Sequence, residues 1–164
     1  MAESFDGGHI GGAVWADEPE WEYRRTSAGC MVCSAGAPLD VIAETNSIWV
    51  TAQQDAPLPG YVCVVSKQHV CEPFELSQDA QAAFWVEATK VAAAIANVDD
   101  PVKMNYEVHG NTIPHLHLHL FPRHRDDPYV GGPIDPRIAT FRRSKEQIAA
   151  IQEAVRGGLE TGGS

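Results

Sequence analysis

Two hydrophobic patterns divide the chain into predicted strands and helices. Segments that alternate apolar and polar residues, or that are rich in β-branched residues, predict strands, because successive strand side chains point to opposite faces of a sheet. Five such segments are 39–44, 48–53, 61–67, 101–109 and 115–121. Helical spacing and end signals predict helices over 17–25, 77–97 and from 144 onward. This order favours an α+β fold with an antiparallel sheet.

The two longer helices have clear start signals. Ser77 is suited to cap the first of them, whose predicted buried face comprises Phe84, Ala88, Val91 and Ile95. The segment 144–147 has the form of a capping box and opens the second. We expect the paired glycines Gly157 and Gly158 to end that helix.

The ends of the chain differ in composition from its middle. Residues 1–16 are rich in glycine and show no hydrophobic period, so we predict a mobile or draped arm. Residues 126–137 hold too many prolines and glycines for regular structure. The predicted organisation is an N-terminal arm with a short helix (1–29), a central domain (30–125) and a C-terminal extension with a helix (126–164).

The strand predicted at 115–121 is the strongest candidate for chemistry. It places His115, His117 and His119 on one face, about 6.6 Å apart, with the leucines between them on the other. Pro114 and Pro122 are expected to bound it. A strand with a polar face that happens to be rich in histidine is the structural alternative. Three of the seven histidines at strict spacing of two favour a functional site.

Imidazole can be a nucleophile, a proton carrier or a metal ligand near neutral pH. Residue types alone therefore leave two hypotheses open, a metal site or covalent catalysis by one histidine. The preceding segment 110–112, Gly-Asn-Thr, offers backbone N–H groups, an amide and a hydroxyl that suit phosphate oxygens. Arg123 could add a cation from the other side.

The run from His115 to Phe121 matches the His-x-His-x-His-x-x signature, with x apolar. From about Cys30 to Arg123 the chain resembles the histidine triad family of nucleotide hydrolases and transferases. The resemblance implies an antiparallel sheet of about five strands with a long helix on it. It also implies a homodimer, because the family usually pairs two subunits into a continuous sheet.

The resemblance assigns catalytic roles to the triad. It implies that His117 attacks the α-phosphorus of a nucleoside phosphate and forms a nucleotidyl-histidine, which water then hydrolyses. His119 would contact the phosphate, unless it is a spectator at the strand edge, and His115 completes the triad. A third histidine favours hydrolysis over transfer. Dinucleoside polyphosphates such as diadenosine tetraphosphate lead as substrates, followed by nucleoside phosphoramidates and aminoacyl-adenylates.

The resemblance also indicates substrate-binding positions. Those that match residues holding phosphate and ribose in the family are Gln53, Asn105, Gly110, Asn111 and Thr112, with His117 and His119.

The chain departs from the family at two of its positions. Gln53 stands where many members have an Asp or Asn that binds ribose, and Tyr61 stands where many have a histidine bonded to the triad. The segment between Asn105 and His115 is also one residue shorter than expected. The departures at Gln53 and Tyr61 support the alternative hypothesis of a nucleotide-binding or sensing module with little turnover.

A CxxC pair, Cys30 and Cys33, precedes the first strand. Some bacterial members of the family use such a pair for a structural zinc, with a histidine after the third strand and the first triad histidine as the other ligands. The resemblance thus implies a zinc site of Cys30, Cys33, His69 and His115, with Cys71 as a competing ligand that we expect to be a bystander. In a third hypothesis, the protein is a zinc protein without enzymatic activity, and the triad itself binds metal.

Composition limits the partners. A formal charge of −10 argues against non-specific nucleic-acid binding, although it does not exclude a small anionic ligand. No apolar run approaches the length of a membrane span, and the first residues lack the features of a secretory signal. We therefore expect a cytoplasmic protein with reduced cysteines, no nucleic-acid partner and no membrane contact. The nucleotide substrate is implied by the resemblance alone.

Overall fold

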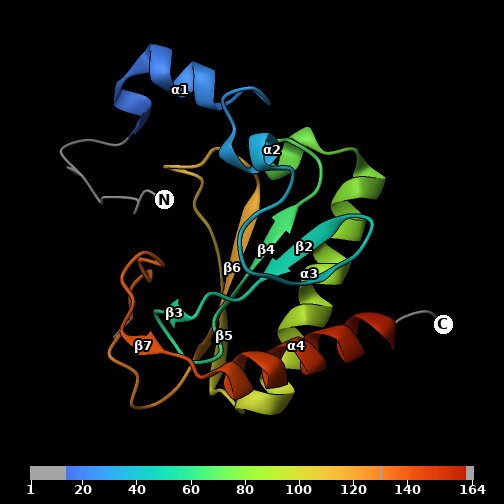
Figure 1. Cartoon of the computed structure of the whole chain (residues 1–164), viewed down its shortest axis with the longest axis vertical. Helices are drawn as coiled ribbons and strands as arrows, with labels where there is room; N and C mark the ends of the chain where they lie inside the picture. Colours follow the sequence, from blue (N-terminus) through green and yellow to red (C-terminus); the bar gives the residue numbers. More distant parts are fainter. Residues whose placement is uncertain (1–13, 130, 162–164) are drawn as a thin grey trace.

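A five-stranded antiparallel sheet forms the centre of the molecule (Figure 1). The computed structural model describes residues 14–129 and 131–161. The strand order is β1-β2-β4-β6-β5. The strands are β1 (Val41–Glu44), β2 (Ile48–Thr51), β4 (Val62–Ser66), β5 (Lys103–Val108) and β6 (His117–Arg123). The predicted α+β class and five-stranded sheet are confirmed, and the histidine-bearing β6 lies between β4 and β5.

Within residues 14–129 and 131–161, four α-helices and a small second sheet lie around the main sheet. The helices are α1 (Glu18–Arg24), α2 (Met31–Ala35), α3 (Gln78–Asp99) and α4 (Lys145–Glu160). The second sheet pairs β3 (Asp55–Ala56) with β7 (Phe141–Arg142), and short 3-10 turns span Val14–Ala16 and Pro73–Glu75. The predicted caps are confirmed, since the hydroxyls of Ser77 and Ser144 accept the N–H groups of Ala80 and Gln147.

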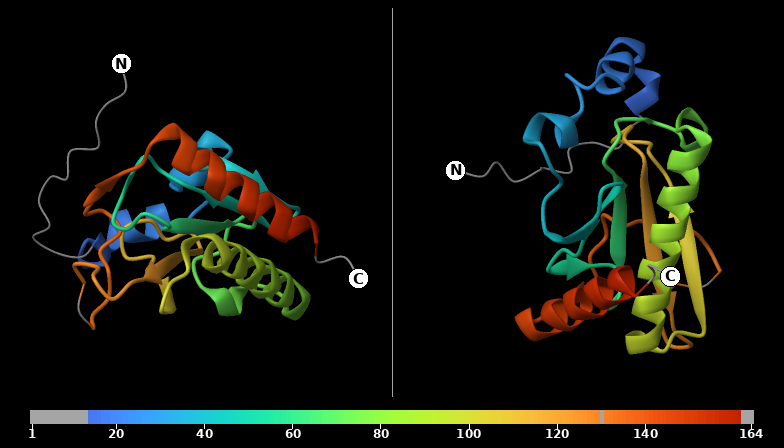
Figure 2. Two further views of the ribbon diagram at one scale, coloured as in Figure 1. Left: turned by 90° about the horizontal axis from the view of Figure 1, so that it is seen from below. Right: turned by 90° about the vertical axis from the view of Figure 1, so that its right-hand side faces the viewer.

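The main core lies between one face of the sheet and α3. Figure 2 shows α3 running along this face of the sheet, and α4 crossing α3. The predicted apolar face of α3 is buried, and it packs in one cluster with the leucines of the histidine segment. These leucines are Leu116, Leu118 and Leu120, none more than 1% exposed. Their alternation forces His117 and His119 onto the opposite face.

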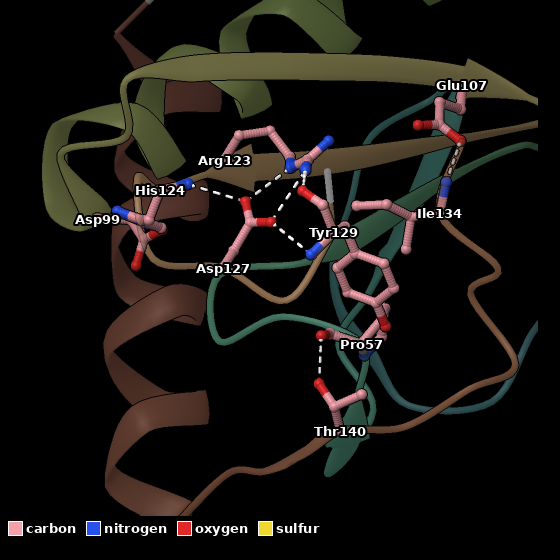
Figure 3. Close-up of polar contacts among 9 residues, drawn as sticks. All are labelled: Pro57, Asp99, Glu107, Arg123, His124, Asp127, Tyr129, Ile134 and Thr140. Carbon is pink, nitrogen blue, oxygen red and sulfur yellow. Dashed lines mark hydrogen bonds and ion pairs between the residues drawn. The ribbon is translucent and has the colours of Figure 1, made fainter. Parts of the chain in front are cut away.

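The segment after β6 covers that opposite face. Ile134 is fully buried there in a second cluster that includes Tyr61 and Phe121. Figure 3 shows how polar contacts hold this segment: Asp127 pairs with Arg123 at 2.8 Å, and the hydroxyl of Thr140 donates to the carbonyl of Pro57. As predicted, the described residues of segment 126–137 form no helix or strand. These polar contacts hold the segment against the sheet.

Strand β6 is shifted from its predicted bounds. His115 lies before the strand, because Leu116 donates its N–H to Val70 in the loop after β4, at 2.7 Å. The strand also continues through Pro122, which we expected to end it. Its ladder with β4 stops at the pair of Leu120 and Val62, so the missing N–H of the proline costs no bond on that side.

Helix α4 continues past the glycines that we expected to end it. A Cβ atom on Gly158 would lie 2.8 Å from the Cβ of Ala94 in α3. The glycine therefore serves the close approach of two helices rather than a C-terminal cap.

The predicted arm at 1–16 lies largely outside the described residues, apart from the turn at Val14–Ala16. Among the residues that the structure describes, no helix has both the length and the apolar character needed to cross a membrane.

Candidate functional site

Two cysteines and two histidines converge at the end of the sheet where β4 stops and β6 begins. Cys30 caps α2 and Cys33 lies one turn later, while His69 follows β4 and His115 precedes β6. One sulfur or nitrogen atom from each lies within 4.8 Å of all the others. The Sγ atoms of Cys30 and Cys33 lie 3.3 Å from the Nδ1 atoms of His115 and His69, respectively. The two Nδ1 atoms lie 3.3 Å apart.

These separations fit a metal ion. Ligand atoms around tetrahedral zinc lie about 3.3–3.8 Å from one another, given bonds of about 2.0–2.3 Å. Both imidazoles are also fixed in one tautomer, because a carbonyl oxygen can only accept a hydrogen bond. The Nε2 of His69 bonds the Arg25 carbonyl at 2.8 Å, and that of His115 bonds the Ser66 carbonyl at 2.7 Å. Each Nδ1 is left unprotonated, as a metal ligand requires.

Cys71 is turned away from this cluster. Its sulfur contacts the carbonyl of Pro114 at 3.0 Å, and it is not one of the four grouped ligands. The Cys₂His₂ set predicted from the sequence is therefore the one that the fold assembles. It leaves no ligand position open, which is typical of structural rather than catalytic zinc.

His117 has the opposite tautomer. Its Nδ1 lies 2.6 Å from the carbonyl of His115 and donates to it, so Nε2 carries the free lone pair. Burial lowers the pKa of His117, although the bond to the carbonyl opposes the shift. An imidazole that is neutral at neutral pH, with one nitrogen held and the other free, is suited to nucleophilic attack.

His119 lies beside His117, with ring centroids 4.8 Å apart at right angles. Its Nδ1 is 2.8 Å from the hydroxyl of Tyr61, which supplies a bond to the triad from the position where many family members have a histidine. Burial lowers the pKa of His119 to about 3 and raises that of Tyr61 well above its usual value. Both groups are therefore neutral near pH 7.

The predicted phosphate and ribose positions are spread more widely. Asn105 pairs with Phe121 on the same face as His119, and Gly110 has the left-handed φ of 76°. Asn111 is exposed, while the carbonyl of Thr112 accepts a bond from Arg24 in α1. Gln53 is exposed two residues beyond the end of β2.

A family model of the HIT domain matches residues 35–126, more than half of the chain and the whole of β6. The chain belongs to the HIT domain family. A comparison with curated protein sequences found no significant match.

Solved HIT structures share this fold. A histidine triad protein from Bradyrhizobium japonicum superposes with a TM-score of 0.65 at 22% identity, covering 73% of this chain and 89% of its own. One from Marinobacter aquaeolei gives 0.63 at 25% identity, with coverage of 73% and 88%. A Zn-bound histidine triad family protein from Mycobacterium smegmatis gives 0.57 at 20% identity, with coverage of 82% and 96%.

Two residues that lie beside the triad of this HIT domain were not assigned to a site by the sequence interpretation. The ring of His109 lies 5.1 Å from that of His119, and its Nε2 is 2.9 Å from Oε2 of Glu107. A signal was present, because Asn105, Glu107 and His109 occupy every second position and share a strand face. Glu107 is opposite His119 in the register of β5 and β6.

Proposed function

We propose that this HIT domain protein is a nucleotide hydrolase that acts at an α-phosphate through a nucleotidyl-histidine intermediate. The observation that carries the proposal is the bond from Nδ1–H of His117 to the carbonyl of His115, because it leaves Nε2 free to attack. HIT family membership supports the substrate class, a nucleotide. Dinucleoside polyphosphates and nucleoside phosphoramidates are the proposed substrates.

The proposed reaction uses the neighbouring rings of His117, His119 and Tyr61. Nε2 of His117 forms a P–N bond to the α-phosphorus while the bond to the leaving group breaks. Water then attacks the phosphorus, and the P–N bond breaks to release His117. If the phenol of Tyr61 donates to Nδ1 of His119, Nε2–H of His119 is available to a phosphate oxygen. We propose that Asn105 and the turn at 110–112 supply further donors, with Gln53 contacting ribose.

Covalent trapping tests this function. Incubation with α-labelled ATP or diadenosine tetraphosphate should yield an acid-labile adduct, which His117→Asn should abolish. The amide nitrogen of asparagine can keep the bond to the His115 carbonyl, so the variant should fold and bind metal as the wild type does. An adduct that survives in His117→Asn would overturn the assignment of the nucleophile.

We propose zinc as the ion of the Cys₂His₂ cluster. The sulfur and nitrogen donors suit zinc, and the similar Mycobacterium smegmatis protein is described as Zn-bound. The ion would tie the segment of α1 and α2 to the start of β6 and hold the carbonyl of His115 in place. Zinc analysis of protein purified without chelator should give one equivalent, and an absence of zinc there would contradict the proposal.

We further propose that a second copy pairs with β5. This strand is at the edge of the sheet. Tyr106 and Val108 on the strand are exposed, and so is Val102 directly before it. Sedimentation should show a dimer for the wild type and a monomer for Tyr106→Asp. Val41→Asp on the opposite edge strand is the matched control and should remain dimeric. A monomeric wild type would overturn the proposal.

A nucleotide-binding module with little turnover is the second candidate. Tyr61 favours it, because a phenol with a raised pKa relays protons less readily than imidazole does. Calorimetry showing tight nucleotide binding, without adduct or product, would support this candidate over the hydrolase.

A further inference from the structure

Cleavage of a phosphoramidate or an alkyl ester at the α-phosphate needs a proton donor for the leaving group. An amine or alkoxide leaves phosphorus readily only if it is protonated as the bond breaks. Nδ1–H of His117 is held by a carbonyl. Neither Tyr61 nor His119 can act as an acid near neutral pH. Burial raises the pKa of Tyr61, which therefore keeps its proton, and lowers the pKa of His119, which is therefore neutral. The triad and Tyr61 therefore do not supply this proton by themselves.

His109 lies beside the triad with the geometry of an acid–base pair. It follows the last residue of β5, and its ring stands at 86° to that of His119. Its Nε2 contacts the carboxylate of Glu107 at 2.9 Å. The same carboxylate oxygen accepts the N–H of Ile134 from the C-terminal extension at 3.2 Å (Figure 3). Glu107 is therefore fixed from two sides, with its side chain only 14% exposed.

This arrangement leaves Nδ1 of His109 as the exchangeable position. A carboxylate that binds one ring nitrogen holds the imidazole in one orientation. His109 is 27% exposed, and with Glu107 it lines an open pocket of about 660 Å³. Among the described residues, His117, His119 and Asp135 interact with it electrostatically, and Lys103 and Arg123 line the same pocket.

We infer that His109 is the general acid of the first step and the general base of the second, with Glu107 as its positioning residue. Nδ1–H protonates the leaving atom as Nε2 of His117 bonds to phosphorus. Neutral His109 then takes a proton from the attacking water as the P–N bond breaks and Nε2 of His117 is released. The inference rests on the proposed function, and it gives the Glu-x-His sequence at 107–109 a role in that reaction.

Leaving-group dependence tests this role. The two probes are an alkyl phosphoramidate of AMP, whose amine must be protonated, and the p-nitrophenyl ester of AMP, whose phenolate leaves unprotonated. In single-turnover measurements, His109→Gln should slow cleavage of the amidate about 10²–10⁴-fold and of the ester less than about 3-fold. Glu107→Gln should slow the amidate selectively by a smaller factor and leave the ester unchanged, since the imidazole of His109 loses the carboxylate that orients it.

His124→Gln is the matched control. His124 bonds Asp99 at 2.8 Å and is 29% exposed, and it follows Arg123, the last residue of β6, at the end of the strand away from the triad. It should leave both rates unchanged. Equal slowing of both probes in His109→Gln, or no slowing, would overturn the role of His109. If the wild type forms no adduct with either probe, the proposed function itself fails, and that result is distinguishable because it does not involve the His109 variant.

Discussion

His115 and His117 are two residues apart and have opposite tautomers. Nε2–H of His115 donates to the Ser66 carbonyl, leaving Nδ1 for the metal cluster. Nδ1–H of His117 donates to the carbonyl of His115 itself, leaving Nε2 free on the other side of the ring. One backbone carbonyl thus joins a metal site to a candidate nucleophile.

The difference shows that the acceptors around a ring, rather than the residue type, decide its chemistry. His115 is only 1% exposed and is buried between the loop after β4 and the two cysteines of the cluster. His117 is partly exposed on the face of β6. Because a carbonyl cannot donate, each ring is committed to one protonated nitrogen. Variants that remove one function should therefore leave the other largely intact.

The largest expected effect is the loss of turnover in His117→Asn. Removing a nucleophile should lower kcat roughly 10⁴–10⁶-fold. The metal content and thermal midpoint should stay within experimental error, because the variant leaves His115 untouched. Parallel kinetics, metal analysis and calorimetry check this. A loss of metal together with activity would show that the two sites are not separable.

The converse variant, Cys30→Ser, should release the metal. Structural zinc contributes on the order of 10 kcal/mol of binding free energy in small domains, so we expect a fall in unfolding free energy of several kcal/mol. Activity should fall less than about 10-fold, because His117 keeps its bond to the carbonyl of His115. Metal analysis and denaturant titration measure the outcome. Matched Cys63→Ser, at a buried thiol outside the cluster, should retain the metal.

His119 should make stability depend on pH. Its pKa is lowered to about 3, whereas an unfolded histidine titrates near 6.5, so the unfolded chain binds a proton that the folded chain does not. The free energy of unfolding should therefore fall by about 2–4 kcal/mol as the pH drops from 7 to 4. His119→Gln should reduce that slope in urea titrations at each pH. An unchanged slope would contradict the lowered pKa.

The smallest expected effect is that of Tyr61→Phe. Loss of the hydroxyl leaves a buried nitrogen of His119 without its partner, at a cost of about 1–3 kcal/mol in stability. We expect kcat/KM to fall about 10-fold with metal content unchanged. Steady-state kinetics and thermal unfolding check both. A fall as large as that of His117→Asn would place Tyr61 in the chemical step.

The sequence by itself determined the fold class, the caps and the segregation of leucines from histidines, because these depend on local periodicity and short-range bonds. It also named the four metal ligands, through the resemblance to a family. It did not place His115 before the strand or show that α4 passes Gly158, since both depend on contacts with distant elements.

The tertiary structure alone decided which nitrogen of His115 is free and which groups surround His109. The acceptor for His115 comes from the end of β4, the ring beside His109 comes from β6, and the donor to Glu107 comes from the C-terminal extension. Such contacts join residues far apart in the chain, and no periodicity encodes them. The three histidines alternate identically in the sequence, and their chemistry diverges because the fold surrounds each with different acceptors.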